Sequence, residues 1–193
     1  MTKGRLEAFS DGVLAIVLTI MVLELKVPHG NSFADLIPVI PVFLSYVLSF
    51  IYVGIYWNNH HHMLHTVHRV TGPILWANLH LLFWLSLIPV ATGWLGENSF
   101  ASAPSMLYGA VLLMSAVAYF ILQQTIIHSQ GEGSVLLKAV GEDWKGKTSV
   151  TLYALALVLA LWSGPAAHII YVVVALIWLL PDRRIERTLQ AER

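Results

Sequence analysis

The sequence contains no cysteine, and only 11% of its 193 residues are charged. The absence of cysteine excludes disulfide bonds, thiolate metal sites and cysteine nucleophiles. Soluble domains carry about 25% charged residues, so this shortage of charge is typical of an integral membrane protein. The formal net charge is zero, which gives no electrostatic basis for binding nucleic acid. We find no Ser-His-Asp order, glycine-rich phosphate loop or paired catalytic carboxylates, so the sequence predicts neither an enzyme nor a cofactor site.

Hydrophobic residues, in contrast, make up 57% of the chain and fall into six segments. We therefore predict an all-α integral membrane protein with one domain over 1–193 and six transmembrane helices. The predicted helices are 6–27, 36–62, 71–93, 104–126, 148–163 and 166–181. The first spans about 33 Å, enough to cross a bilayer core of about 30 Å, whereas the last two have only about 16 residues each and are short for a span.

The basic residues are distributed unevenly between the two ends of these segments. With the N-terminus inside, ten Lys and Arg residues fall on the inner side and only Lys26 on the outer side. This bias predicts a multi-pass protein of the cell membrane with both termini in the cytoplasm. We see no internal repeat, so each chain would supply a single copy of the first helix.

The first helix has two faces that differ in character. At 100° per residue, a stripe of mainly aliphatic side chains follows one side of it, with Thr19 at its flank. The stripe consists of Phe9, Gly12, Ile16, Ile20, Leu23 and Val27. Asp11 falls about 140° away from Ile16 and Ser10 about 120° away, so both are expected to turn into neighbouring protein. The stripe either faces lipid or forms a functional surface of the protein.

Ionisable groups at membrane depth are costly, so Asp11 calls for hydrogen-bond donors. The donors expected in the same layer of the membrane lie near the inner ends of the second and third helices. They are Trp57, Asn58, Asn59, His60, His61, Asn78 and His80. Asp11 and these donors form either a hydrogen-bond network that fixes the first helix against the second and third or a proton relay, and we favour the network.

A histidine cluster ends the second helix, with His61, His65 and His68 at i, i+4 and i+7 on one helical face. Such a pair at i, i+4 can bind a transition metal, but the sequence supplies no carboxylate at useful spacing, so we predict no metal site. The cluster also suits pH sensitivity, because imidazole titrates near neutrality. An alternative function is therefore a proton- or metal-coupled transporter that uses Asp11 and the residues His60 to His68.

The stretch RLEAFSDGVLAIVLTIMVLELKVP resembles the first helix of the transmembrane protein 175 family, the lysosomal potassium channels and their prokaryotic homologues. Arg5, Phe9, Ser10 and Asp11 carry the resemblance, as an RxxxFSD pattern that opens a spanning helix. With a single six-helix unit, the chain is similar to the prokaryotic members. The resemblance implies a homotetramer around a central pore lined by the first helix, with potassium ions, the lipid bilayer and copies of itself as partners.

By the same resemblance, the pore constriction and selectivity region falls on Ile16, Thr19, Ile20 and Leu23. The sequence has no TVGYG filter, so selectivity would arise from aliphatic rings that force the ion to shed water, which costs potassium less than sodium. The residues expected to pack against the FSD segment are Trp57, Asn58, His61 and Asn78. Glu24 lies near the outer mouth, where it would attract cations as a ring or, alternatively, pair with Lys26 or water.

Overall fold

The computed structural model describes residues 2–141 and 143–179, and within these ranges the chain is entirely helical apart from its connections. The α-helices of this part of the chain are α1 (Lys3–Leu23), α2 (Ile40–His65), α3 (Gly72–Ser86), α4 (Ile88–Glu97), α5 (Ser102–Gln130), α6 (Val135–Val140), α7 (Trp144–Ala160) and α8 (Gly164–Leu179). Two 3-10 helices, η1 (Phe33–Val39) and η2 (Gly131–Gly133), precede α2 and follow α5.

Within the described residues, four helical segments are long and apolar enough to cross a membrane. They are Lys3–Leu23, Phe33–His65, Gly72–Glu97 and Ser102–Gln130, and they coincide with the first four predicted helices. The other two predicted spans coincide with α7 and α8, of 17 and 16 residues. That these two cross the membrane stays a prediction, and residues 180 and 181 of the last one lie outside the described residues.

The helix ends differ from the predicted ones where local backbone chemistry decides them. α1 stops at Leu23 rather than at residue 27, with Glu24 as its C-cap. α5 continues to Gln130 and ends at Gly131, whose φ of 66° is a conformation that glycine adopts without steric cost. The third span is interrupted at Leu87 between α3 and α4, because Pro89 has no backbone N–H and its ring excludes a regular helix before it.

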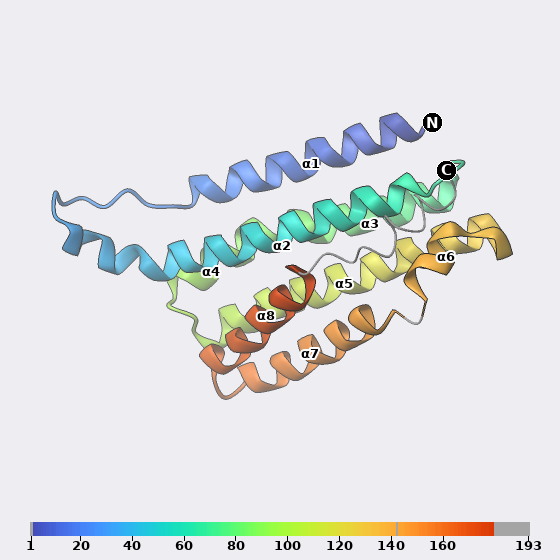
Figure 1. Ribbon diagram of the computed structural model, residues 1–193. Coiled ribbons are helices and arrows are strands. Elements are labelled where there is room, and N and C mark those ends of the chain that lie inside the picture. The colour runs from blue at the N-terminus through green and yellow to red at the C-terminus, as the bar shows by residue number, and fades with distance from the viewer. Residues whose placement is uncertain (1, 142, 180–193) are drawn as a thin grey trace.

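The helices run roughly side by side, with α1 at one edge of the bundle and α7 at the other (Figure 1). α1 packs against α2, α3 and α4, while α5 packs against α3, α4, α7 and α8. Buried tyrosines tie the middle of the bundle together: the Tyr52 hydroxyl donates to the carbonyl of Tyr171 at 2.6 Å, and the Tyr171 hydroxyl donates to the carbonyl of Ser105 at 3.0 Å. At Gly109 a Cβ atom would collide with the Tyr171 hydroxyl, so this position requires glycine.

One end of the bundle gathers the N-terminus and several helix ends. Lys3 on α1 contacts the end of α2, and Gln130 at the end of α5 contacts the same turn of α2. Because α1 lies at the edge of the bundle, one of its faces is not covered by another helix of the chain.

Candidate functional site

The two faces of α1 are clearly separated in the structure. Its buried side consists of Leu6, Ser10, Leu14, Val17 and Met21. The predicted constriction residues lie on the opposite side of the helix: Ile16 is 58% exposed, Ile20 43% and Leu23 80%. A large aliphatic stripe of this kind marks a surface that lipid, another protein or a second copy of the chain covers.

Thr19 lies in the same exposed region, and its hydroxyl turns back onto the helix. The hydroxyl is within 3.1 Å of the carbonyl of Ala15 and 3.0 Å of the carbonyl of Ile16. A threonine hydroxyl has one donor and two acceptor lone pairs. Because the donor is used by the backbone, the oxygen keeps acceptor capacity, which is the property that a cation needs.

A buried hydrogen-bond network fixes the other side of α1. The Asn78 amide of α3 donates to the Ser10 hydroxyl at 3.0 Å, and Ser10 donates to the carbonyl of Leu6 at 2.9 Å. The His60 Nε2 of α2 lies 2.7 Å from the Asn78 carbonyl oxygen, which makes the imidazole the donor. Ser10 and Asn78 are fully buried and His60 is 2% exposed. Three helices are therefore joined by three side chains.

Asp11 takes part in a separate contact at the surface. The Trp57 indole Nε1 donates to Asp11 Oδ1 at 3.0 Å, and both side chains are exposed in the single chain. The expectation that Ser10 and Asp11 both turn into the protein is therefore correct for Ser10 alone. Neighbouring residues point about 100° apart on a helix, and the buried face of α1 is centred near Ser10.

Only some of the predicted partners of the motif contact it. Trp57 and Asn78 make the contacts, whereas Asn58 and His61 are exposed and, within the described residues, make no hydrogen bond to the motif. His60 occupies the place that was predicted for His61. His60 continues the i+4 period of Tyr52 and Tyr56 on α2, but that this face of α2 is the buried one follows only from the packing of the neighbouring helices.

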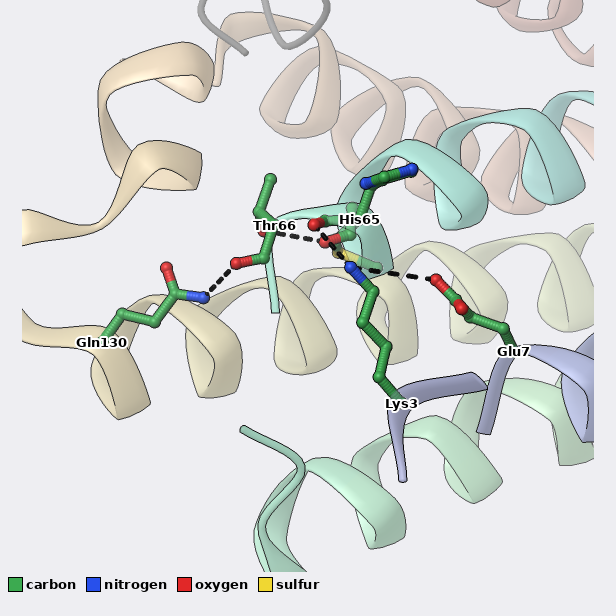
Figure 2. Close-up of polar contacts among 6 residues, drawn as sticks. Lys3, Glu7, His65, Thr66 and Gln130 are labelled. Carbon is green, nitrogen blue, oxygen red and sulfur yellow. Dashed lines mark hydrogen bonds and ion pairs between the residues drawn. The ribbon is translucent and has the colours of Figure 1, made fainter. Parts of the chain in front are cut away.

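Lys3 provides a further attachment that the sequence did not single out. Its ammonium donates to the carbonyl of His65 at 2.7 Å and lies 4.0 Å from the Glu7 carboxylate, as Figure 2 shows. The Gln130 amide donates to the carbonyl of Thr66 at 2.6 Å. Carbonyls in the last turn of a helix have no partner within the helix, so these donors stabilise the end of α2. Arg5 of the motif is exposed.

The histidine cluster does not form the continuous face that its spacing predicts. α2 ends at His65, with Thr66 as its C-cap, so His68 lies beyond the helix. The rings of His61 and His65 stand edge to face, 5.5 Å apart. Among the residues that the structure describes, no group of three His, Asp or Glu side chains is placed to hold a metal ion.

At the opposite end of α1, Glu24 is exposed and lies next to Gly93 of α4. Lys26 pairs with Glu97 rather than with Glu24, at 2.5 Å. The hydrogen bond and the charge of Glu97 raise the pKa of Lys26 above its usual value. Lys26 is therefore paired with Glu97 and not with Glu24, whose carboxylate is exposed at this end of the helix. This is compatible with both the cation-attracting ring and the solvated carboxylate that the sequence left open.

This geometry is accompanied by clear similarity to known proteins. The family described as endosomal/lysosomal potassium channel TMEM175 matches residues 5–89, which include most of α1 and the whole of α2 and α3. A potassium channel of Chryseobacterium sp. (strain P1-3) is 58% identical over 190 residues, which cover 98% of this chain and 99% of that protein.

More distant relatives share the same region. The crystal structure of a lysosomal potassium-selective channel TMEM175 homolog from Chamaesiphon minutus superposes with a TM-score of 0.82 at 27% identity, covering 93% of this chain and 97% of that chain. The endosomal/lysosomal proton channel TMEM175 of Bos taurus is 29% identical over 150 residues, which cover 68% of this chain and 31% of that protein.

Proposed function

The chain belongs to the TMEM175 family of potassium channels, and from this premise we propose that four copies surround a central pore lined by α1, through which potassium ions cross the cell membrane. The observation that supports this proposal is the exposed stripe of α1. Its side chains are mainly aliphatic, it runs from Phe9 to Leu23 of a membrane-spanning helix, and it lies away from the face that packs against α2, α3 and α4.

In this arrangement Ile16, Ile20 and Leu23 of four chains form successive rings around the ion path. A narrow apolar ring offers no oxygen to replace lost water, so it favours the ion whose partial dehydration costs less, which is potassium. The Thr19 oxygens, whose lone pairs remain available, lie between the Ile16 and Ile20 rings and replace part of the lost hydration. Selectivity of this origin is modest, and closure of the rings stops the current by dewetting.

Glu24 follows the last ring in the sequence. Four exposed carboxylates near the mouth of the pore raise the local concentration of cations. The contacts of Ser10, Asp11 and Asn78 lie away from the stripe, so in this proposal Ser10 and Asp11 of the RxxxFSD motif hold the pore helix in place and do not touch the ion.

The decisive experiment measures ion flux through the purified protein in liposomes, together with its oligomeric state. We expect a tetramer that passes potassium passively, driven by voltage, with potassium preferred over sodium. If the protein is folded and tetrameric and neither ion moves, the proposal is wrong.

The same liposomes distinguish the channel from the alternative proton- or metal-coupled transporter. A transporter would give saturable flux that depends on a pH gradient or a metal gradient, whereas a pore gives flux that follows the membrane voltage alone. The relatives in animals are described as proton channels, so proton flux should be recorded in parallel with potassium flux.

A further inference from the structure

A cavity of about 420 Å³ lies on the far side of α2 from α1, between α2, α5, α7 and the end of α8. Aromatic residues form much of its wall: Tyr52, Tyr56, Phe120, Tyr153 and Trp178. Its size falls within the range of about 300–1,000 Å³ that is usual for ligand pockets. The stripe of α1 and the motif contacts take no part in it.

The polar atoms around the cavity are largely used within the protein. The Tyr52 hydroxyl donates to the carbonyl of Tyr171, and the Trp178 indole donates to the Ser149 hydroxyl at 2.8 Å. The Asn59 amide donates to the carbonyl of Ile55 at 2.8 Å. The surface that remains for a ligand is therefore mainly carbon, which suits an alkyl chain and gives little to orient a polar molecule.

One end of the cavity is charged and lies at the end of the bundle that carries the N-terminus. Lys147 lines it and is exposed, and the Lys145 ammonium stands 5.8 Å from the centre of the Trp178 ring. Asp143 also lines this end, but its carboxylate accepts hydrogen bonds from the Gly146 N–H and the Gln123 amide, both at 3.2 Å. These hydrogen bonds do not remove its negative charge, but among the described residues here two lysines stand against one carboxylate, so this end of the cavity has a net positive charge.

Two tryptophans indicate the depth at which the charged end of the cavity lies in the membrane. Trp144 opens α7 and is 52% exposed, and Trp178 lies in the last turn of α8. Tryptophan is enriched at the level of lipid headgroups, so the lysine end of the cavity lies at the membrane surface and the tyrosine end lies deeper.

We propose that this cavity binds one acyl chain of an anionic phospholipid, with the phosphate group beside Lys147 and Lys145. A molecule with a long apolar tail and a negative head matches both ends of the cavity, and the bilayer that surrounds a membrane-spanning bundle supplies it at high concentration. Basic side chains next to a span attract anionic lipid headgroups in the same way.

The test is native mass spectrometry of the full chain in detergent, titrated with phosphatidylglycerol or with phosphatidylcholine of the same acyl chains. We expect one tightly bound phosphatidylglycerol per chain. Val150→Phe fills the cavity from α7 and should weaken binding by at least about fivefold. Lys147→Gln should reduce the preference for phosphatidylglycerol by about fivefold while phosphatidylcholine binding is unchanged.

Matched controls separate the cavity from general lipid contact. Val158→Phe places the same side chain on an exposed position of α7, and Arg69→Gln removes a charge from the same end of the bundle outside the cavity, so both should bind as the unmodified chain does. Ala116→Leu fills the cavity from α5 and replaces Val150→Phe if that variant does not fold.

Three outcomes would overturn the proposal. Equal binding of the two lipids by the unmodified chain would remove the role of the lysines. Equal loss of binding in Val150→Phe and Val158→Phe would place the lipid on the outer surface. If lipid binds only after residues 180–193 are deleted, the occupant of the cavity is the C-terminal segment of the chain itself.

Discussion

At the scale of single residues, Asn78 has the most demanding position in the attachment of α1. It is fully buried, donates to Ser10 and accepts from His60, so its amide satisfies one side chain on each neighbouring helix. An amide is suited to this task because it has both donors and an acceptor. An apolar residue of similar size would leave the buried His60 N–H without an acceptor and would remove one of the two hydrogen bonds of Ser10.

We therefore predict that Asn78→Leu lowers the free energy of unfolding by about 1–3 kcal/mol for each group left unsatisfied. The midpoint of thermal unfolding in detergent measures the loss. Asn58→Leu is the matched control, because Asn58 is exposed on α2 and the same change there should have little effect. Equal losses in the two variants would contradict the network as the source of stability.

The second residue of interest is Ile16, which is exposed in the single chain and lies in the proposed ring. An asparagine at this position would bring water into the constriction, so we predict that Ile16→Asn raises conductance and lowers the preference for potassium over sodium. Single-channel recording of potassium and sodium currents in planar bilayers measures both quantities.

The control for this prediction is Val22→Asn. Val22 is also exposed on α1 but points about 120° away from Ile16, outside the stripe. Its replacement should leave ion preference unchanged. If Ile16→Asn keeps the selectivity of the unmodified chain, Ile16 does not line the ion path.

At the scale of elements, α1 is an edge helix that is held by a few polar contacts and one apolar face. Asp11 contacts Trp57 and Ser10 contacts Asn78, while Lys3 caps the end of α2. Hydrogen bonds to a charged group contribute more to stability than hydrogen bonds between neutral groups. The hydrogen bond between Trp57 and Asp11 should therefore contribute measurably to holding α1 against α2.

We predict that Asp11→Ala lowers thermal stability or tetramer assembly before it changes ion preference. Trp57→Phe removes the same hydrogen bond from the other side, and the double variant should lose less than the sum of the two single losses. A double-mutant cycle on the free energy of unfolding should give a coupling of about 0.5–1 kcal/mol, because both side chains are exposed in the single chain. A stable tetrameric Asp11→Ala variant with altered ion preference would show that Asp11 contributes to the pore.

At the scale of the whole molecule, polar contacts hold the helices together at both ends and in the middle of the bundle. α1 lies at the edge of this bundle (Figure 1), and its stripe is exposed. In the part of the chain that is described, the histidines do not gather into a set of three metal ligands, and His68 lies beyond the end of α2. A metal-coupled transporter would need a set of side chains of this kind to bind its metal ion.

We accordingly predict that treatment with EDTA leaves potassium flux and the unfolding midpoint of the purified tetramer unchanged. His65→Ala should behave like the unmodified chain in the same flux measurement. Loss of flux or stability on chelation, restored by adding back a transition metal, would favour the metal-coupled transporter.

Much of this fold could be predicted from local pattern. The hydrophobic segments, the break near Pro89 and the stripe of Ile16, Ile20 and Leu23 all follow from residues close together in the chain. The end of α2 at His65 was not predicted, because its last turn is stabilised by Lys3 and Gln130, which are more than 60 residues away.

The sequence by itself therefore determined that this is a membrane protein whose first helix has an aliphatic face, because helical period and hydrophobicity are local properties. Only the tertiary structure decided that Ser10 is buried while Asp11 is exposed, and that His60 rather than His61 meets Asn78. Adjacent helix residues differ by about 100° in direction, and the phase is set by which side packs against the neighbouring helices. That choice depends on contacts between distant segments, which no local pattern contains.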